Sequence, residues 1–290
     1  MTLRIGTRRS ALALAQARLV AEALGGGELV EIVTAGDRGA PGGDKSRWVA
    51  ELERALLEGE VDIAVHSAKD VPGELAAGLV IASVPERADP RDVLVGAASL
   101  DDLAQGARIG TSSLRRAAQL RAAREDLEVV AMRGNVDTRL RKLAEGEWEA
   151  IVLAVAGLER LGRAGVAGQA LEDFVPAPGQ GALAVEARAD DAPTREALSA
   201  IDHEPSHASL RAERAFTRAL GASCHTPVGA LARDGALEAF AGLPDGSEWV
   251  RDRGEGDDPE ALGREVAERM LAAGAGDLLR RAEAEVGGDS

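Results

Sequence analysis

Two adjacent charged residues, Lys69 and Asp70, offer the clearest chemistry in this sequence. They follow Ile63–Val65, an apolar run typical of a buried strand, within the segment Val61–Pro72 (VDIAVHSAKDVP). Ligands of open α/β sheets bind just beyond the carboxyl ends of the strands. A carboxylate at that place can donate a proton or stabilise developing positive charge. The alternative is a surface salt bridge, but the chain has only three lysines, which makes a chance surface lysine less expected.

Arginines and hydroxyl groups recur in three turns that lead from an expected strand into an expected helix. The free N–H groups of a helix start attract anions, and guanidinium groups form paired hydrogen bonds with carboxylates. Helix capping by the hydroxyl groups is the alternative. The three turns are Thr7–Ser10, Arg108–Arg116 and Arg133–Arg139. Their candidate anion-binding residues are Arg8, Ser10, Ser113, Arg115, Arg116, Arg133 and Arg139.

The charge distribution indicates a small anionic ligand. The chain carries a net charge of −15, which argues against a nucleic-acid partner, and only 2% of its residues are aromatic. The segment Arg108–Lys142 nevertheless holds nine basic and four acidic residues, a local balance of +5. An acidic protein that concentrates its cations in one segment is suited to binding a small anion there.

The elements that must position these residues alternate between strand and helix. Such alternation predicts parallel βαβ units, and two breaker-rich stretches, Val84–Pro90 and Pro176–Gly181, separate them into two α/β lobes. A smaller α+β region follows from about residue 203. We expect the two lobes to face one another across a cleft. The expected strands are Leu3–Ile5, Leu29–Val33, Ile63–Val65, Val93–Val95, Arg108–Gly110, Glu128–Met132, Ala150–Ala154 and Ala182–Glu186, and the expected helices are Ala11–Leu24, Val49–Glu58, Leu114–Arg124 and Thr138–Ala144.

The single cysteine, Cys224, excludes an internal disulfide framework and a multi-thiolate metal site. A lone cysteine is usually a small buried apolar residue. No run approaches the roughly 20 apolar residues of a membrane span. The N-terminal arginines and apolar stretch are followed by acidic and glycine-rich sequence in place of a cleavage site, so we expect no signal peptide and a cytoplasmic protein.

One short motif matches a metal site by its letters alone. His203–His207 (HEPSH) has the form H-E-x-x-H of zinc hydrolases, which requires both histidines on one helical face. Pro205 disfavours helical geometry at Glu204 and is tolerated only in a first helical turn. We expect the helix to start at Pro205 or Ser206 and to leave His203 outside it. We therefore predict no metal.

Several motifs, in their order along the chain, resemble those of the porphobilinogen deaminase (hydroxymethylbilane synthase) family. The resemblance extends from Leu3 to about Ala230, and GASCHTPVGA is similar to the cysteine motif of that family. The other matching segments are VHSAKDVP, GTSSLRRAAQL, RGNVDTRL, AVAGLERLG and PAPGQGALAVE.

The resemblance implies a monomeric transferase that joins four porphobilinogen molecules head to tail and releases ammonia at each addition. It implies two periplasmic-binding-protein-like α/β lobes, 1–85 with 182–200 and 88–178, and a C-terminal α+β domain, 203–290. A dipyrromethane cofactor would be attached to Cys224 through a thioether, and Asp70, with Lys69, would be catalytic. The residues implied to bind the cofactor are Cys224, Lys69, Ser113, Arg115, Arg116 and Arg133, and those implied to bind substrate are Arg8, Ser10 and Arg139.

Two departures from the family pattern stand out. The family usually has Gly-Lys-Gly-Leu-Phe before the second helix, where this chain has Asp44–Trp48 (DKSRW), and Trp48 can replace the phenylalanine as a flat contact for a pyrrole. Ala222 and Ser223 precede Cys224 where two glycines are commoner, and His225 follows it. A non-catalytic, two-lobed binding protein for a small polycarboxylate is the alternative function that the arginines and lobes leave open.

Overall fold

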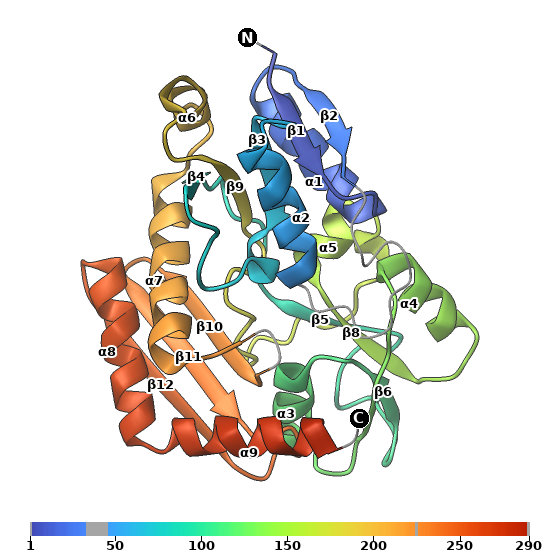
Figure 1. Ribbon diagram of the computed structural model, residues 1–290. Coiled ribbons are helices and arrows are strands. Elements are labelled where there is room, and N and C mark those ends of the chain that lie inside the picture. Colours follow the sequence, from blue (N-terminus) through green and yellow to red (C-terminus); the bar gives the residue numbers. More distant parts are fainter. Residues whose placement is uncertain (1, 33–45, 224–225, 289–290) are drawn as a thin grey trace. The chain divides into compact units, whose positions relative to one another are not determined.

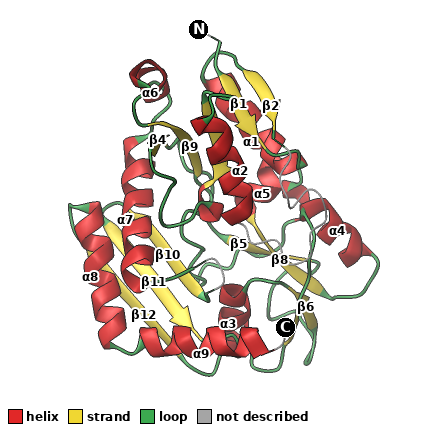
Figure 2. Cartoon of the chain, in the orientation of Figure 1, coloured by secondary structure: helices red, strands yellow, loops and turns green. Residues whose placement is uncertain are grey.

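The computed structural model describes residues 2–32, 46–223 and 226–288 (Figure 1, Figure 2). The chain divides into two compact units. Unit 1 comprises Met1–Ala88 and Gly181–Leu210, and unit 2 comprises Asp89–Gln180 and Arg211–Ser290. Of the residues expected in a separate C-terminal domain, those from Arg211 on group with the second lobe, and the division into three domains stays a prediction.

The described part of unit 1 is built around one mixed sheet with the strand order β2-β1-β3-β9-β4. β1 pairs in parallel with β2 and β3, whereas β9 runs antiparallel to both β3 and β4. The strands are β1 (Arg4–Thr7), β2 (Glu28–Glu31), β3 (Ile63–Ser67), β4 (Leu79–Ser83) and β9 (Leu183–Arg188). The helices are α1 (Ala11–Ala23), α2 (Ser46–Leu57), the 3₁₀ turn η2 (Ala68–Asp70), α6 (Ala192–Ser199) and the part of α7 (Glu204–Leu220) up to Leu210.

Helices cover both faces of this sheet because its central strands are apolar on both sides. Ile63 and Val65 of β3 point to a core shared with α1, and the intervening Ala64 points to a core shared with α2. All three side chains are at most 3% exposed. Successive side chains of a strand alternate between faces, so a continuous apolar run is what a sheet covered on both sides requires. β3 is therefore a rigid support for the residues that follow it.

Unit 2 contains a second mixed sheet with the order β5-β8-β6-β7. β6 is parallel to β7 and β8, and β5 runs antiparallel to β8. Leu120 of α3 packs with Ile109 and Val152 in one of its cores. The elements are β5 (Asp92–Val95), β6 (Arg108–Gly110), α3 (Leu114–Ala123), β7 (Glu128–Val130), α4 (Val136–Ala144), β8 (Ala150–Ala154), α5 (Val155–Arg160) and the 3₁₀ turn η3 (Ala164–Val166).

The C-terminal part of unit 2 is an antiparallel sheet, β10-β11-β12, with helices on one side. Its strand β10 docks on the end of the second lobe, because Ala230 N–H donates to Pro176 O at 2.9 Å and Phe240 packs with Ala118 and Val175. These contacts explain why both parts form one unit. The elements are β10 (Val228–Arg233), β11 (Ala236–Gly242), β12 (Trp249–Glu255), α8 (Pro259–Ala272), α9 (Ala275–Gly288) and the rest of α7.

The expected fold class, two α/β lobes with a smaller α+β region, is confirmed. The expectation of parallel βαβ units is wrong for β5, and no direction was predicted for the strand Ala182–Glu186. The predicted strand Ala182–Glu186 corresponds to β9, and Val93–Val95 corresponds to β5, and both run antiparallel to their neighbours. Each enters its sheet after one of the breaker-rich stretches between the units.

Candidate active site

A cavity of about 60 Å³ in unit 1 gathers the residues predicted from two separate motifs. Arg8 and Ser10 come from the turn between β1 and α1, and Asp70 comes from the turn after β3. The parallel pairing of β1 and β3 places the carboxyl ends of both strands at the same sheet edge. The other polar or aromatic side chains that line the cavity belong to Gln16, Trp48, His66 and Ser67.

Local structure fixes the polar groups at this edge. Ser10 is the N-cap of α1, and its Oγ accepts a hydrogen bond from Ala13 N–H at 3.2 Å. Asp70 ends the 3₁₀ turn that begins directly after β3, and Lys69 precedes it in the same turn. Both side chains are partly exposed. β3 is hydrogen-bonded on both edges, by β1 and by β9, so the short turn that carries Asp70 follows a strand held on both sides.

Arg8 lies over an aromatic ring. Its guanidinium carbon is 3.8 Å from the ring centre of Trp48, which stands in the first turns of α2. A guanidinium at this distance is attracted by the negative face of the indole. The ring face expected to contact a pyrrole is therefore occupied by an arginine in this structure. Asp44 and Lys45, which belong to the segment that differs from the family pattern, lie outside the described residues.

A buried histidine–glutamate pair lies beside the cavity and was not predicted. His66 Nε2 is 3.6 Å from Glu186 Oε2, and both side chains are buried. This separation exceeds a hydrogen bond, and among the described residues neither Glu186 oxygen has a hydrogen-bond partner. A buried carboxylate without hydrogen bonds is costly, and the imidazole of His66 is the side chain that lies beside it. The glutamate ends the motif PAPGQGALAVE and lies in the apolar strand β9. The residue types of this segment do not indicate a partner on the neighbouring strand.

In unit 2 the predicted arginines of α3 form a buried ion cluster. Arg115 and Arg116 are 3% and 6% exposed, and both bind the fully buried carboxylate of Asp92 at 2.7 Å. Gln180 Nε2 donates to the same carboxylate at 2.8 Å. Much of the hydrogen-bonding capacity of both arginines is therefore used within the protein. Their binding of a ligand stays a prediction.

Burial and mutual repulsion lower the pKa values of two of the predicted arginines. Burial lowers the pKa of Arg115, and the nearby Arg116 adds to this effect, while Asp92 opposes it. Burial also lowers the pKa of Arg139, again with a contribution from the charge of Arg116. Burial would raise the pKa of Asp92, but the two guanidinium groups outweigh it and hold that pKa well below its ordinary value. The cluster holds two guanidinium charges against one carboxylate, so an anion would complement it.

The third predicted turn presents its arginines differently. Arg133 is exposed, and within the described part of the chain its guanidinium makes no ion pair or hydrogen bond. Arg139 Nε donates to Gly134 O at 2.8 Å, which holds its side chain across the turn. The hydroxyl of Ser113 caps α3 through Arg116 N–H at 3.4 Å. The capping alternative thus describes Ser113 correctly, and an anion-binding role for it stays a prediction.

Family models for two domains match this chain. "Porphobilinogen deaminase, dipyromethane cofactor binding domain" matches residues 3–196, and "Porphobilinogen deaminase, C-terminal domain" matches residues 208–272. The chain belongs to the porphobilinogen deaminase family. The resemblance drawn from the motifs is confirmed.

Relatives named porphobilinogen deaminase match along nearly the whole chain. The protein from Brevibacillus brevis is 48% identical, over 95% of this chain and 96% of its own length. The protein from Thermus thermophilus is 49% identical, over 95% of this chain and 97% of its own length. A solved periplasmic substrate-binding protein of an ABC transporter from Coxiella burnetii matches with a TM-score of 0.42 and 16% identity, covering 73% of this chain and 97% of that one.

The cofactor named by the family model fits the donors that the structure presents. Dipyrromethane carries acetate and propionate side chains and so needs cationic partners. Arg115 Nε is buried without a hydrogen-bond partner among the described residues, and the Arg133 guanidinium is exposed. Both are donors that a carboxylate of the cofactor could satisfy. Cys224, the predicted attachment point, lies outside the described residues, between Ser223 and Thr226.

A further cation of the porphobilinogen deaminase motif AVAGLERLG was not singled out from the sequence. Arg160 ends α5, and burial lowers its pKa to about 10. A cation perturbed by desolvation is a candidate functional residue. Arg160 could have been found from the sequence, because its short helix directly follows β8. The other arginines were found from the same strand-to-helix arrangement.

The zinc-hydrolase alternative has no support in the described residues, where no group of three or more potential metal ligands gathers. α7 begins at Glu204, earlier than the expected start at Pro205 or Ser206, and His203 lies outside the helix as predicted. Its Nδ1 is 2.8 Å from Ser206 Oγ, and His207 Nδ1 is 2.9 Å from Asp202 Oδ1. Both histidines are therefore used in local hydrogen bonds. The helices of the described chain also include none with the length and apolar character to cross a membrane.

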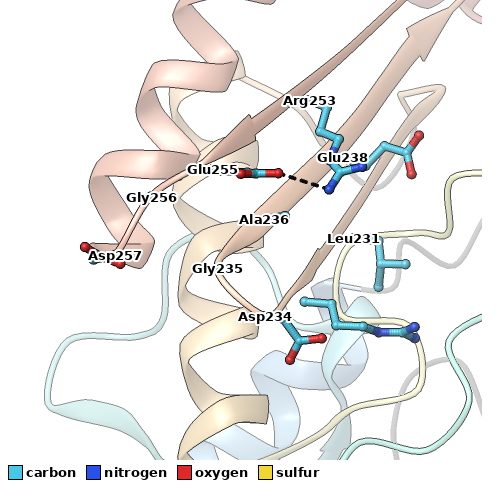
Figure 3. A pocket seen from close by; sticks show the side chains of 10 residues that line it. Leu231, Asp234, Gly235, Ala236, Glu238, Arg253, Glu255, Gly256 and Asp257 are labelled. Carbon is cyan, nitrogen blue, oxygen red and sulfur yellow. Dashed lines mark hydrogen bonds and ion pairs between the residues drawn. The ribbon is translucent and has the colours of Figure 1, made fainter.

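A larger hollow, of about 580 Å³, lies at the turn between β10 and β11 (Figure 3). Four acidic side chains line it, among them Asp234 and Glu238, together with two arginines. One of these arginines, Arg253, is already paired with Glu255 at 3.1 Å. An excess of carboxylates disfavours a polycarboxylate ligand, so this hollow is not the site for the chemistry of the family.

Proposed function

We propose that this chain is a hydroxymethylbilane synthase, which condenses four porphobilinogen molecules head to tail on a dipyrromethane cofactor. The observation that carries the proposal is the cavity of unit 1, which brings Asp70 together with Arg8 and Ser10. Asp70 supplies a carboxylate for the reaction. Arg8 and the helix-capping hydroxyl of Ser10 can bind the acidic side chains of the substrate. The family and the relatives described above support the same activity.

Asp70 is the proposed catalytic carboxylate. In each addition the C–N bond of the aminomethyl group of porphobilinogen breaks, ammonia leaves, and a C–C bond forms to an α-carbon that loses its proton. Asp70 assists proton transfer to the departing amine and stabilises the positive charge that develops on the pyrrole nitrogen. Its position in a short turn directly after a strand that is paired on both edges keeps the carboxylate preorganised. Lys69 precedes it and offers a cation to a substrate carboxylate.

The arginines and Ser113 hold the acidic side chains. Each pyrrole contributes two carboxylates, so a growing chain needs many cationic donors. Arg8, Ser10 and Arg139 bind the incoming substrate. Dipyrromethane, when bound, supplies the tethered α-carbon from which the chain grows. The residues that would hold it are Cys224, Lys69, Ser113, Arg115, Arg116 and Arg133.

Intact-protein mass spectrometry tests this proposal. The purified protein should be heavier than its sequence by one covalent dipyrrole, and Cys224→Ala should lose that adduct. A polycarboxylate-binding protein, the alternative function, would show no adduct and would not consume porphobilinogen. Absence of both the adduct and tetrapyrrole formation in the unmodified protein would exclude the synthase.

The chain is further proposed to act as a monomer in the cytoplasm. A monomer is what the resemblance to the family implies, and its site residues all come from one chain. Size-exclusion chromatography with light scattering tests the first point. Cell fractionation tests the second, with the protein expected in the cytoplasmic fraction.

A further inference from the structure

Trp48 combines two features at the edge of the cavity in unit 1. Its ring supports the Arg8 guanidinium at 3.8 Å. Its Nε1 atom is shielded from solvent, and among the described residues it has no hydrogen-bond partner. Both Trp48 and Arg8 line the cavity that contains Asp70. A cation with a defined orientation and an unused N–H donor therefore stand at one site.

The Nε1 atom of Trp48 is buried without a partner among the described residues, as is that of Trp148, although Trp48 as a whole is only partly buried. The N–H of a buried tryptophan normally finds an acceptor, and leaving such a group unsatisfied costs stability. An acceptor that arrives with the ligand would remove this cost. A substrate carboxylate fits best, because it pairs with the guanidinium of Arg8 and also accepts hydrogen bonds from neutral N–H groups.

The N–H donor is present because this chain has a tryptophan at position 48. Phenylalanine, usual at this place in the family, has a ring face but no N–H group. Tryptophan keeps the face, on which cations bind best of all the aromatic residues, and adds the donor. The substitution therefore changes how the site can bind a carboxylate, beyond offering a flat surface.

We propose that Trp48 is a substrate-positioning residue whose ring orients Arg8 and whose N–H donates to a carboxylate of porphobilinogen. This inference rests on the proposed function, since it takes porphobilinogen as the ligand. It assigns Trp48 to binding, with no part in the chemical step. Losing its hydrogen bond should therefore raise KM and leave kcat unchanged.

Steady-state kinetics of the cofactor-loaded enzyme tests the proposal. Trp48→Phe removes the N–H and keeps the ring, and it should raise KM for porphobilinogen about tenfold, the effect of one hydrogen bond to a charged group. Trp48→Leu also removes the ring and should raise KM about threefold more. Trp249→Phe is the matched control, because Trp249 is 53% exposed in unit 2, and its kinetics should match the unmodified enzyme.

A spectroscopic measurement separates hydrogen bonding from a structural effect. The ultraviolet resonance Raman band of the indole N–H should shift when porphobilinogen is added to Asp70→Asn enzyme, which is expected to bind without turnover. The shift should be absent in the double variant with Trp48→Phe. If Trp48→Phe proves unstable, the presence or absence of the shift in Asp70→Asn enzyme decides the question.

The outcomes distinguish this inference from the proposed function. A KM within twofold of the unmodified enzyme in Trp48→Phe, with no Raman shift, overturns the role of Trp48 while the enzyme still forms tetrapyrrole. A chain that forms no tetrapyrrole even with its cofactor attached overturns the proposed function and, with it, the role of Trp48. A raised KM with unchanged kcat and a Raman shift supports both.

Discussion

Asp92→Asn is expected to lower the free energy of unfolding of unit 2 by about 3 kcal/mol or more. The carboxylate is fully buried and accepts hydrogen bonds from Arg115, Arg116 and Gln180. Asparagine has the same shape but keeps one acceptor oxygen and turns an N–H group toward these donors. Removing one partner of a buried ion pair costs about 3–5 kcal/mol, because the remaining charge stays buried without compensation.

Urea unfolding followed by tryptophan fluorescence measures this loss. Two of the three tryptophans, Trp148 and Trp249, belong to unit 2, so a Trp48→Phe background makes the signal report on that unit. Glu238→Gln is the control, because Glu238 pairs with Arg251 at 2.6 Å on the surface, where such pairs contribute about 0–1 kcal/mol. A loss for Asp92→Asn no larger than that of the control would refute the reasoning.

The pH dependence of this difference follows from the pKa of Asp92. That pKa is depressed in the folded protein, since the charges of Arg115 and Arg116 outweigh the effect of burial. A depressed pKa stabilises the fold above the unfolded value of about 3.9, and the contribution disappears as the pH falls. The difference in unfolding free energy between the two proteins should be constant from about pH 5 to 7 and shrink below about pH 4. A difference that grows on acidification would contradict this account.

Four further changes test other parts of the structure. Asp70→Asn should lower tetrapyrrole formation at least about 100-fold, the scale of a lost proton-transfer group, with unchanged circular dichroism, and normal turnover would remove Asp70 from its role. Arg133→Ala should stall chain growth without loss of stability and leave short enzyme-bound oligopyrroles visible by intact mass. Arg115→Ala should stall growth and also destabilise the fold, and normal rates in both variants would argue against a carboxylate-binding role. Gly229→Ala would place a Cβ 2.6 Å from Val175 O and should cost about 1–3 kcal/mol in urea unfolding, whereas an unchanged midpoint would show that the contact relaxes freely.

Local patterns predicted most elements of the lobes, because apolar runs and helix caps act over short distances. Arg108–Gly110 and Ala150–Ala154 coincide with β6 and β8. Strand direction is decided by distant pairing and could not be predicted in the same way. β9 enters the sheet of unit 1 only after the chain has formed the second lobe, and its antiparallel register, His66 opposite Ala184, leaves no local trace. β4, a short apolar run, was not predicted at all.

The candidate site divides along the same line. The turns that carry Arg8, Ser10 and Asp70 were each predicted separately, from the polar residues that follow an apolar strand. The parallel pairing of β1 and β3 brings these turns together. Asp92 was not predicted, because an aspartate at the start of a strand is ordinarily exposed. Charged residues are buried almost only when paired, and a partner two elements away along the chain cannot be identified from residue types alone.

The ion cluster of unit 2 has a surplus of positive charge that structural stability alone does not require. The charge of one buried carboxylate is balanced by one guanidinium, yet Asp92 binds two. Burial and the charge of Arg116 lower the pKa of both Arg115 and Arg139. The protein therefore bears a desolvation and repulsion cost within its folded state. A ligand carboxylate at this cluster would reduce that cost, because it would supply negative charge beside the arginines. We propose that Asp92 is more than a structural counter-ion, since it holds Arg115 and Arg116 in place for a ligand carboxylate.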